Sequence, residues 1–383
     1  MLADYYDFVV IGGGIAGVSV ASELAKKNKV ILVEQERQMG YHTTGRSAAI
    51  SMETYGSEQI RALTKASGDY FRNTLPGGQS LTHKRGALFV CDTEHRNKLE
   101  RHYQTVSKLT ENIYWLESDE LQEQYPMLSE QWVAGVYEPD AIDIDVNAYH
   151  QYCLKQIIEL GSVTKTNAEV TALTRERDHW QVKCNNFSFS AKVIVNTAGA
   201  WADNIAVLAG ISPLGLEPLK RSALLIECAD AVDDLPYVAD INESFYFKPD
   251  AGLIMISPCD ETLELPCDVR PDEIDIAMGM ERFENATSLI VNKLKSKWAG
   301  LRTFAKDRNP IIGFDCRIDG FFWLAGQGGY GIQTAPAIAS LSHSLLCSEP
   351  LSHHLTAVGI NPLDYSPERF INHKNEVIIC QKK

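Results

Sequence analysis

Residues 7–34 read DFVVIGGGIAGVSVASELAKKNKVILVE, two apolar runs separated by a glycine-rich turn and an alanine-rich stretch. The run at 7–11 ends in glycines, which predicts a buried parallel strand. Residues 15–27 are predicted to form a helix, and the apolar run at 30–33 a second buried strand. Strand, helix and strand within the first 34 residues predict a βαβ unit.

The turn in this unit fits the spacing Gly-x-Gly-x-x-Gly with Gly12, Gly14 and Gly17. In a dinucleotide site the first glycine permits the turn, the second leaves room for a pyrophosphate, and the third lets helix and strand pack closely. The helix N-terminus offers free N–H groups to the phosphates. Glu34 closes the second strand, where a carboxylate accepts ribose hydroxyls and repels the 2′-phosphate of NADP.

Three further features favour FAD over NAD. The loop at 40–48, GYHTTGRSA, combines glycines, hydroxyls and a cation, and such a loop can follow an extended pyrophosphate. Two distant segments, 193–210 and 321–341, repeat the order of apolar strand, glycine turn and helix. The second helix is expected to start near Ile332, with its N-terminus beside a reduced flavin. Three glycine turns on one chain indicate a single long dinucleotide.

The composition excludes several classes of protein. The formal charge of −14 argues against a nucleic-acid backbone or an anionic membrane surface as partner, since both attract clustered Lys and Arg. Nine cysteines lie between Cys91 and Cys380 without a Cys-x-x-Cys pair, which fits a reducing cytoplasm better than a disulfide framework or a zinc site. No basic leader with an apolar stretch and no transmembrane segment is expected. We predict a cytoplasmic protein, or one peripheral to the inner membrane, with no metal site.

The remaining segments predict a second, sheet-rich region. Residues 86–91 and 244–248 mix aromatic and β-branched side chains and are expected to form antiparallel strands. Residues 143–160 are predicted to form a helix capped by its acidic start. We therefore predict an α/β fold, α+β overall. A Rossmann-like FAD-binding domain at 1–80, 140–215 and 300–383 would be interleaved with an antiparallel-sheet substrate domain at 81–139 and 216–299.

Specific stretches along the chain carry a family resemblance. The glycine turn, Glu34, YHTTGRSAA, NTAGAW and GQGGYGIQT resemble the FAD-dependent D-amino acid dehydrogenase and oxidase family, and so do DIDVNAYHQ, KRSA, SFYFKPDAG and WAGLRTF. The resemblance runs to about Arg369 and is closest to the bacterial D-arginine dehydrogenases. The cofactor contacts that it implies are Gly12, Gly14, Ile15, Ala16, Gly17, Glu34, His42, Thr43, Thr44, Gly45, Arg46, Ser47, Ala48, Val170, Ala198, Gly199, Trp201, Gly326, Gly328, Gly329, Tyr330, Gly331, Ile332, Gln333 and Thr334.

The resemblance also implies a substrate site. Arg221 and Arg302 match arginines that hold a substrate carboxylate, which suits the planar guanidinium fork. Tyr55 and Tyr246 match tyrosines that line the site, and the implied substrate contacts also include Gly329 and Gln333. Two departures from the arginine-preferring relatives stand out. Gly86 replaces a Glu that meets the substrate guanidinium, and Ile50 and Met52 replace a His and a Thr, so the pocket lining at Ile50, Met52 and Gly86 disfavours selectivity for D-arginine.

The predicted reaction is oxidative deamination of a D-amino acid, by hydride transfer from Cα to flavin N5, to a 2-oxo acid and ammonia. No acid or base is assigned. One alternative is an oxidase or dehydrogenase of secondary amines such as sarcosine or proline. An alternative of another class is a flavin-binding protein without turnover. Oxygen, a quinone or another carrier are all compatible electron acceptors, and the sequence decides neither the acceptor nor the oligomeric state.

Overall fold

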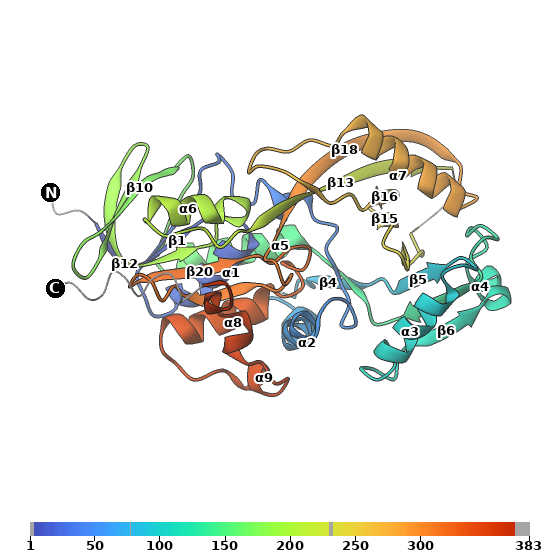
Figure 1. Ribbon diagram of the computed structural model, residues 1–383, viewed down its shortest axis with the longest axis horizontal. Helices are drawn as coiled ribbons and strands as arrows, with labels where there is room; N and C mark the ends of the chain where they lie inside the picture. Colours follow the sequence, from blue (N-terminus) through green and yellow to red (C-terminus); the bar gives the residue numbers. More distant parts are fainter. Residues whose placement is uncertain (1–3, 77, 230–232, 372–383) are drawn as a thin grey trace.

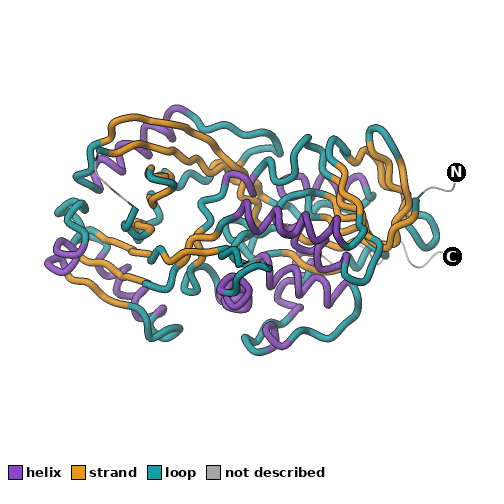
Figure 2. Tube along the Cα trace, turned by 180° about the vertical axis from the view of Figure 1, so that it is seen from behind, coloured by secondary structure: helices purple, strands orange, loops and turns teal. Residues whose placement is uncertain are grey.

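The computed structural model describes residues 4–76, 78–229 and 233–371. Its ribbon has two regions joined along the long axis, and both described ends of the chain lie at the same end of the molecule (Figure 1). Each region is built on its own large sheet, and the view from behind shows the same division (Figure 2).

The first sheet has eight strands in the order β10-β11-β12-β1-β2-β9, with β20 beside β12 and β19 beside β20. The five strands β20, β12, β1, β2 and β9 run parallel to one another. Their apolar runs fit burial on both faces. The bounds are β1 (Tyr5–Ile11), β2 (Val30–Val33), β9 (Val163–Lys165), β10 (Val170–Arg175), β11 (Trp180–Cys184), β12 (Ser188–Asn196), β19 (Ile311–Phe314) and β20 (Phe321–Ala325).

Helices cover one face of this sheet, and a hairpin and a short helix cover the other. The covering helices are α1 (Ile15–Ala25), α5 (Val146–Glu159) and α8 (Ala335–Leu346), with α2 (Glu58–Arg72) outside α8 and the short α9 (His353–Thr356) beside α2. On the other face, α6 (Ala202–Leu208) packs with the β10–β11 hairpin.

Parallel strands bring their carboxyl ends to one edge of the sheet, and this edge collects the glycine turns. The segments that follow β1, β12 and β20 begin at Gly12, Thr197 and Gly326, and Glu34 directly follows β2. Ligands of open α/β sheets bind outside this edge. The topology therefore gathers four sequence signals that lie up to three hundred residues apart.

The second sheet has nine strands in the order β17-β13-β16-β15-β14-β5-β7-β6, with β18 also paired to β13. Its longest pair, β13 and β18, is antiparallel from Glu217 opposite Phe304 to Cys228 opposite Val291. The bounds are β5 (Ala87–Cys91), β6 (Tyr114–Glu117), β7 (Ala134–Glu138), β13 (Glu217–Cys228), β14 (Tyr237–Asp240), β15 (Tyr246–Asp250), β16 (Leu253–Ser257), β17 (Thr262–Leu263) and β18 (Val291–Phe304). The helices of this region are α3 (Arg96–Val106), α4 (Ser118–Gln124) and α7 (Glu273–Ala286).

A small third sheet lies between the two regions, with β8 (Ile142–Ile144) between β3 (Ile50–Ser51) and β4 (Thr82–Lys84). Short 3-10 helices complete the described chain, and they are η1 (Thr43–Arg46), η2 (Gly199–Trp201), η3 (Pro362–Tyr365) and η4 (Pro367–Phe370).

The prediction of a mixed α/β fold is confirmed, and several element boundaries need correction. Helix α8 begins at Ala335 rather than near Ile332, because Thr334 occupies the N-cap and a proline stands in its first turn. The helix predicted at 143–160 begins at Val146, since residues 142–144 form β8 and Asp145 accepts the N-capping hydrogen bond from Ala148. Strand β5 is antiparallel to β7 but parallel to β14.

The division into two interleaved domains by residue number stays a prediction. The strand β18 passes through position 300, where one boundary was expected, and residues 372–383, including Cys380, lie outside the described residues. The thiols of Cys91, Cys153, Cys184, Cys259, Cys267, Cys316 and Cys347 are free.

Candidate functional site

A cavity of about 730 Å³ opens at the edge where the parallel strands end. Cavities that bind cofactors have volumes of roughly 300–1,000 Å³, so this one has room for a dinucleotide. The predicted cofactor residues that line it are Gly12, Gly14, Ile15, Ala16, Glu34, His42, Thr43, Thr44, Val170, Ala198, Gly199, Trp201, Gly328 and Gly331.

The glycines of the first turn allow close contacts that a side chain would block. Gly12 has a φ of +110°, and a Cβ there would lie 2.6 Å from the carbonyl oxygen of Thr197. A Cβ on Gly17 would lie 1.8 Å from the carbonyl oxygen of Gly12, so this glycine lets helix α1 pack against β1. Gly14 lines the cavity, and its missing side chain leaves the helix N-terminus open toward it.

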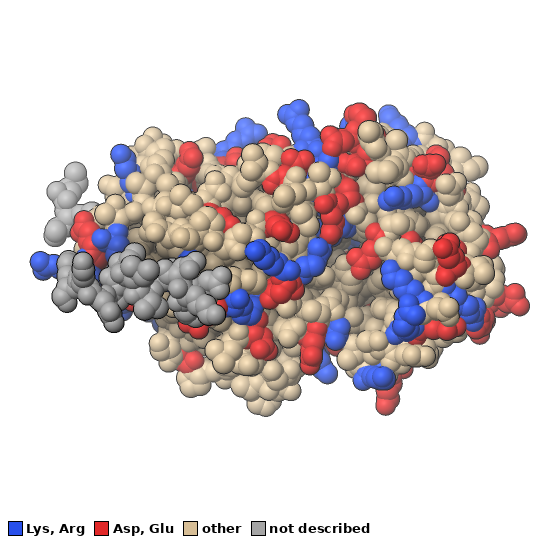
Figure 3. Space-filling view, in the orientation of Figure 1, with Lys and Arg blue, Asp and Glu red and all other residues tan. Residues whose placement is uncertain are grey.

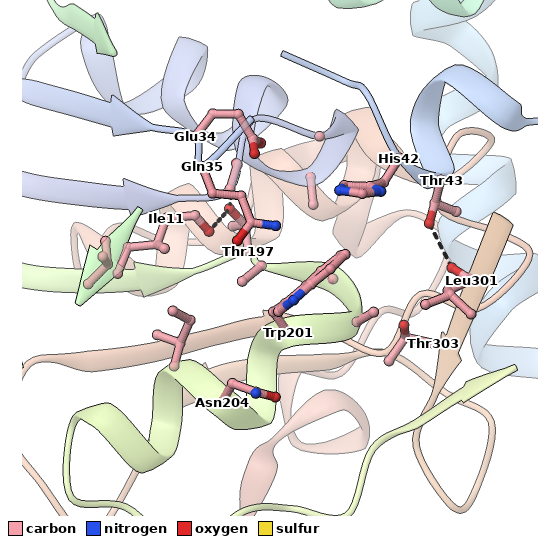
Figure 4. Close-up of a pocket in the computed structure, with 18 of the residues that line it drawn as sticks. Ile11, Glu34, Gln35, His42, Thr43, Thr197, Trp201, Asn204, Leu301 and Thr303 are labelled. Atoms are coloured by element: carbon pink, nitrogen blue, oxygen red, sulfur yellow. Dashed lines mark hydrogen bonds between the residues drawn. The ribbon is translucent and has the colours of Figure 1, made fainter. Parts of the chain in front are cut away.

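Glu34 is buried at the end of β2, with its carboxylate beside the glycine turn (Figure 4). The backbone N–H of Gly13 donates to one carboxylate oxygen at 2.7 Å, and that of Glu36 donates to the other at 2.9 Å. Each oxygen keeps a lone pair for a further donor. The carboxylate is therefore held in place and can accept the ribose hydroxyls of an adenosine.

The middle of the cavity is lined by aromatic and hydroxyl side chains (Figure 4). The rings of His42 and Trp201 lie 4.6 Å apart between centroids, and Thr43 donates to the carbonyl of Leu301 at 2.7 Å. Thr303 is buried and lines the cavity, and its hydroxyl has no hydrogen-bond partner among the described residues. A buried hydroxyl without a partner carries a desolvation cost that a bound ligand can offset.

The loop at 40–48 divides its residues between the cavity and the protein framework. Gly45 donates its backbone N–H to Gly40 at 2.9 Å, which closes the loop. The guanidinium of Arg46 donates to the carbonyl of Ala299 at 2.8 Å and pairs with Asp268, so this cation fixes β18 to the loop. A smaller cavity of about 70 Å³ is lined by Arg46, Ser47, Ala48, Gly328, Gly329, Gly331 and Ile332, among others.

Three predicted cofactor residues of the last turn lie outside the residues that line these cavities. Gly326 has a φ of +73°, which shapes the turn. Thr334 donates to the carbonyl of Tyr330 at 2.8 Å, and the Tyr330 ring packs against that of Tyr55 at 5.2 Å. The side chains of Tyr330 and Thr334 therefore support the turn.

A third cavity of about 50 Å³ borders the last turn and lies against the second sheet. All six predicted substrate residues line it, together with Ile50 and Met52. Its complete lining is Ser47, Ala48, Ala49, Ile50, Met52, Tyr55, Phe89, Arg221, Tyr237, Ala239, Glu243, Phe245, Tyr246, Cys259, Arg302, Gly329, Ile332 and Gln333. We refer to it as the substrate pocket.

The two arginines of the substrate pocket differ in their partners. Arg221 donates to the carbonyl of Asp260 at 2.9 Å and pairs with Glu261 at 3.1 Å. Arg308 also pairs with Glu261 at 2.8 Å. Among the residues that the structure describes, Arg302 has neither an ion-pair partner nor a side-chain hydrogen bond, although it contacts Gly329 and faces the tyrosines. Among the described residues, the pocket therefore holds one cation that shares the Glu261 carboxylate with Arg308 and one cation that has no counter-ion.

Three tyrosines near Arg302, namely Tyr55, Tyr237 and Tyr330, are neutral phenols. Burial raises the pKa of Tyr55 and of Tyr237 far above the ordinary value, and burial also raises the pKa of Tyr330. A neutral phenol donates a hydrogen bond and does not neutralise the guanidinium. Gln333 is buried and donates to Thr64 at 2.7 Å, which fixes its side chain at the pocket wall.

Gly86 is the predicted pocket residue that lies elsewhere. It does not line the substrate pocket, and a Cβ at this position would lie 2.6 Å from the hydroxyl of Tyr137. The prediction that Gly86 lines the pocket therefore needs correction. Glu243 lines the pocket instead, on a backbone with a φ of +56°. Glu243 lies in the turn between β14 and β15, which no motif marks.

Sequence reasoning missed other wall residues for the same reason. The substrate pocket also takes Tyr237 and Cys259 from segments that no motif marks, and Phe89 and Phe245 from strands that were predicted without a role in the site. The larger cavity also takes Thr197, Leu301, Thr303 and Gln327. Thr197 and Gln327 lie inside quoted glycine turns and were within reach of the sequence, whereas Thr303 depends on the register of β18.

Comparison with known proteins identifies the chain. The family model described as FAD dependent oxidoreductase matches residues 7–343. The chain belongs to this family. Its cofactor is FAD, and the glycine turns, the Glu34 carboxylate and the Thr303 hydroxyl without a partner all fit that group.

Individual relatives are distant in sequence and similar in fold. Glycine oxidase from Geobacillus kaustophilus is 23% identical over 385 residues, covering 93% of this chain and 99% of the relative. Its crystal structure matches with a TM-score of 0.84 at 21% identity, over 96% of this chain and all of the other. L-proline dehydrogenase from P. horikoshii matches with a TM-score of 0.79 at 23% identity, over 96% and 98% of the two chains. Human mitochondrial dimethylglycine dehydrogenase is 25% identical over 383 residues, which cover 91% of this chain and 43% of that protein.

Two further findings for the described residues concern metal sites and membrane-spanning helices. No group of three or more His, Cys, Asp or Glu side chains there is arranged to hold a metal ion. No helix in the described ranges is long and apolar enough to cross a membrane. On the face shown in Figure 3, acidic and basic side chains are interspersed.

Proposed function

We propose that this FAD-dependent oxidoreductase oxidises a D-amino acid at Cα to the imine, which water then hydrolyses to the 2-oxo acid and ammonia. The observation that carries the proposal is Arg302, a cation that faces the substrate pocket without a counter-ion among the described residues. A charge in a desolvated pocket is costly unless it is paired. A substrate carboxylate supplies the missing partner, and the guanidinium fork orients it.

The other pocket residues support the same role. Arg221 can share its charge between Glu261 and a substrate carboxylate, because its Nε is already fixed by the carbonyl of Asp260. Although burial opposes it, the Arg308 hydrogen bond and the arginine charges hold the pKa of Glu261 below its ordinary value. Glu261 therefore stays ionised and keeps Arg221 in position before substrate arrives.

Bound FAD supplies the two-electron acceptor, at its N5 atom, for the hydride from Cα. The chain supplies orientation and water exclusion: the arginines fix the carboxylate, and Tyr55 and Tyr246 close the pocket. The buried phenols of Tyr55 and Tyr237 hold their protons, so we assign them as donors rather than bases. The substrate amine is then bound neutral or loses its proton to solvent.

The side-chain preference is proposed to favour apolar D-amino acids over D-arginine. Ile50 and Met52 line the pocket, and its other walls are largely aromatic. Glu243 lines the pocket but is exposed, so solvent screens its carboxylate and a cationic side chain gains little from it.

The second candidate is oxidation of a secondary or tertiary amine such as sarcosine, dimethylglycine or proline. The specific observation is the ring of aromatic side chains, Tyr55, Phe89, Tyr237, Phe245 and Tyr246, around the pocket. Aromatic faces attract methylated ammonium groups. The similarity to proteins named dimethylglycine dehydrogenase and L-proline dehydrogenase supports this candidate, and both candidates use the same arginines.

Anaerobic mixing tests the proposal, with flavin absorbance as the readout. D- and L-forms of Met, Leu, Phe, Arg and Glu are compared with glycine, sarcosine, dimethylglycine and proline. We expect bleaching by apolar D-amino acids first. Bleaching by the N-methylated amines or proline alone would replace the first candidate with the second. A flavin that no amine bleaches would favour a binding protein without turnover.

A further inference from the structure

A buried carboxylate outside the substrate pocket is hydrogen-bonded to a segment that covers the pocket. Glu138 stands at the end of β7, opposite Ala87 of β5, and is 4% exposed. It accepts the backbone N–H of Glu53 at 3.2 Å and the hydroxyl of Thr54, which is itself buried. Neither bond belongs to the regular pairing of a sheet or a helix.

The segment that receives these bonds carries two walls of the substrate pocket. Met52 and Tyr55 both line the pocket, and they flank the two residues that Glu138 holds. The segment follows the two-residue strand β3 and ends where Ser57 caps α2. Between these points, the carbonyl of Gly56 accepts from Arg61 at 2.6 Å, the Tyr55 ring packs against that of Tyr330, and Glu53 forms an exposed ion pair with Arg72 at 3.3 Å. Exposed pairs of this kind contribute little.

We propose that Glu138 is a positioning residue that holds residues 52–55, and with them the Tyr55 side chain, over the substrate pocket. This inference rests on the proposed function for the identity of the substrate. Glu138 belongs to the second sheet. Residues 52–55, the covering segment, adjoin the first region, so the two hydrogen bonds join the regions at the pocket wall. Glu138 acts through Tyr55 and touches neither substrate nor cofactor.

The chemistry of the anchor makes its strength depend on pH. Burial, with a smaller contribution from the nearby carboxylates of Glu53 and Asp140, raises the pKa of Glu138 to about 7 against the hydrogen bonds from Thr54 and Glu53. The ionised form accepts both bonds with a full charge, and charge-assisted bonds are about twice as strong as neutral ones. Burial outweighs this gain, because the folded pKa is raised, so ionisation of Glu138 weakens the anchor as the pH rises through 7.

Four variants test the anchor on the flavin-loaded protein. Glu138→Ala and Thr54→Val each remove a member of the pair, and we expect either change to raise KM about tenfold, with a smaller effect on kcat. Glu138→Gln keeps an acceptor oxygen and should restore KM toward the wild-type value. It should also abolish the inflection near pH 7 in kcat/KM, which a merely structural carboxylate would not produce. Glu53→Gln is the control for KM, because its side chain pairs with Arg72 at an exposed site, and loss of its charge should move the inflection to lower pH.

A second measurement does not depend on turnover. Chymotrypsin cleaves after tyrosine, and we expect faster cleavage at Tyr55 in Glu138→Ala and Thr54→Val than in Glu53→Gln or the wild type. If Glu138→Ala does not fold, Thr54→Val decides the question alone. Wild-type KM and wild-type protection in Thr54→Val would overturn the anchor. If no amine bleaches the wild-type flavin, the proposed function fails, while the cleavage rates still decide the anchor.

Discussion

Replacing Arg302 by Met tests the central assignment most directly. Met keeps much of the side-chain volume and removes the guanidinium that lacks a counter-ion among the described residues. The substrate carboxylate then enters a largely desolvated pocket with one cation, Arg221, that it shares with Glu261. Losing one partner of such a pair costs about 3–5 kcal/mol. At 1.36 kcal/mol per decade, kcat/KM should fall by roughly a hundredfold to a few thousandfold.

The same variant should leave the fold intact. The half-buried Arg302 guanidinium has no ion pair among the described residues and carries a desolvation cost, so its removal should leave Tm equal to or above that of the wild type. Arg302→Lys keeps the charge but loses the planar fork, and its activity should lie between the two. Arg96→Met is the control, because Arg96 pairs with Glu117 at an exposed site in the second region.

The assay is steady-state kinetics with one artificial electron acceptor, with flavin content measured on every sample. The reasoning is refuted if Arg302→Met retains its flavin and loses less than about tenfold in kcat/KM, which is 1.36 kcal/mol. A loss of flavin together with activity would show that Arg302 supports the cofactor instead.

Three further predictions concern the cofactor, the side-chain preference and the buried carboxylate. The purified protein should carry tightly bound, noncovalent FAD that acid precipitation releases, and a colourless protein that binds NAD would contradict the assignment of Glu34 and the glycine turns. Among D-amino acids, Met, Leu and Phe should exceed Arg, Lys and Glu in kcat/KM, because each Å² of apolar surface buried at Ile50 and Met52 gains about 25 cal/mol; a series led by D-Arg or D-Lys would refute this pocket argument. Between its ordinary pKa of 4.5 and about 7, Glu138 keeps its proton in the folded chain and loses it in the unfolded chain, so the free energy of unfolding should fall as pH rises through this range. The fall is about 3 kcal/mol, and chemical denaturation of Glu138→Gln should show a flatter pH dependence, whereas an equal slope in the variant would assign the effect to another group.

Local signals in the sequence were sufficient for the fold class and the cofactor. Gly12 and Gly17 mark a turn whose close contacts exclude side chains, and Glu34 follows the next apolar run, so a few neighbouring residues predict the dinucleotide site. The glycine turns at Ala198–Gly199 and Gly326–Gly331 could also be recognised, because each follows an apolar strand. Such patterns are short in sequence and do not depend on distant partners.

The tertiary structure decided which side chains meet at the pocket and what charge they leave unpaired. Arg221 and Arg302 look alike in sequence, yet only Arg221 receives a carboxylate, because Glu261 is brought to it by the loop that follows β16. A side chain at Gly86 would point toward Tyr137, while Glu243 reaches the pocket from a turn with no motif. Glu138 and Thr54 lie 84 positions apart and meet only because β7 ends beneath the covering segment. Ion pairing, burial and side-chain direction depend on how the two regions pack together, and a single sequence does not record that packing.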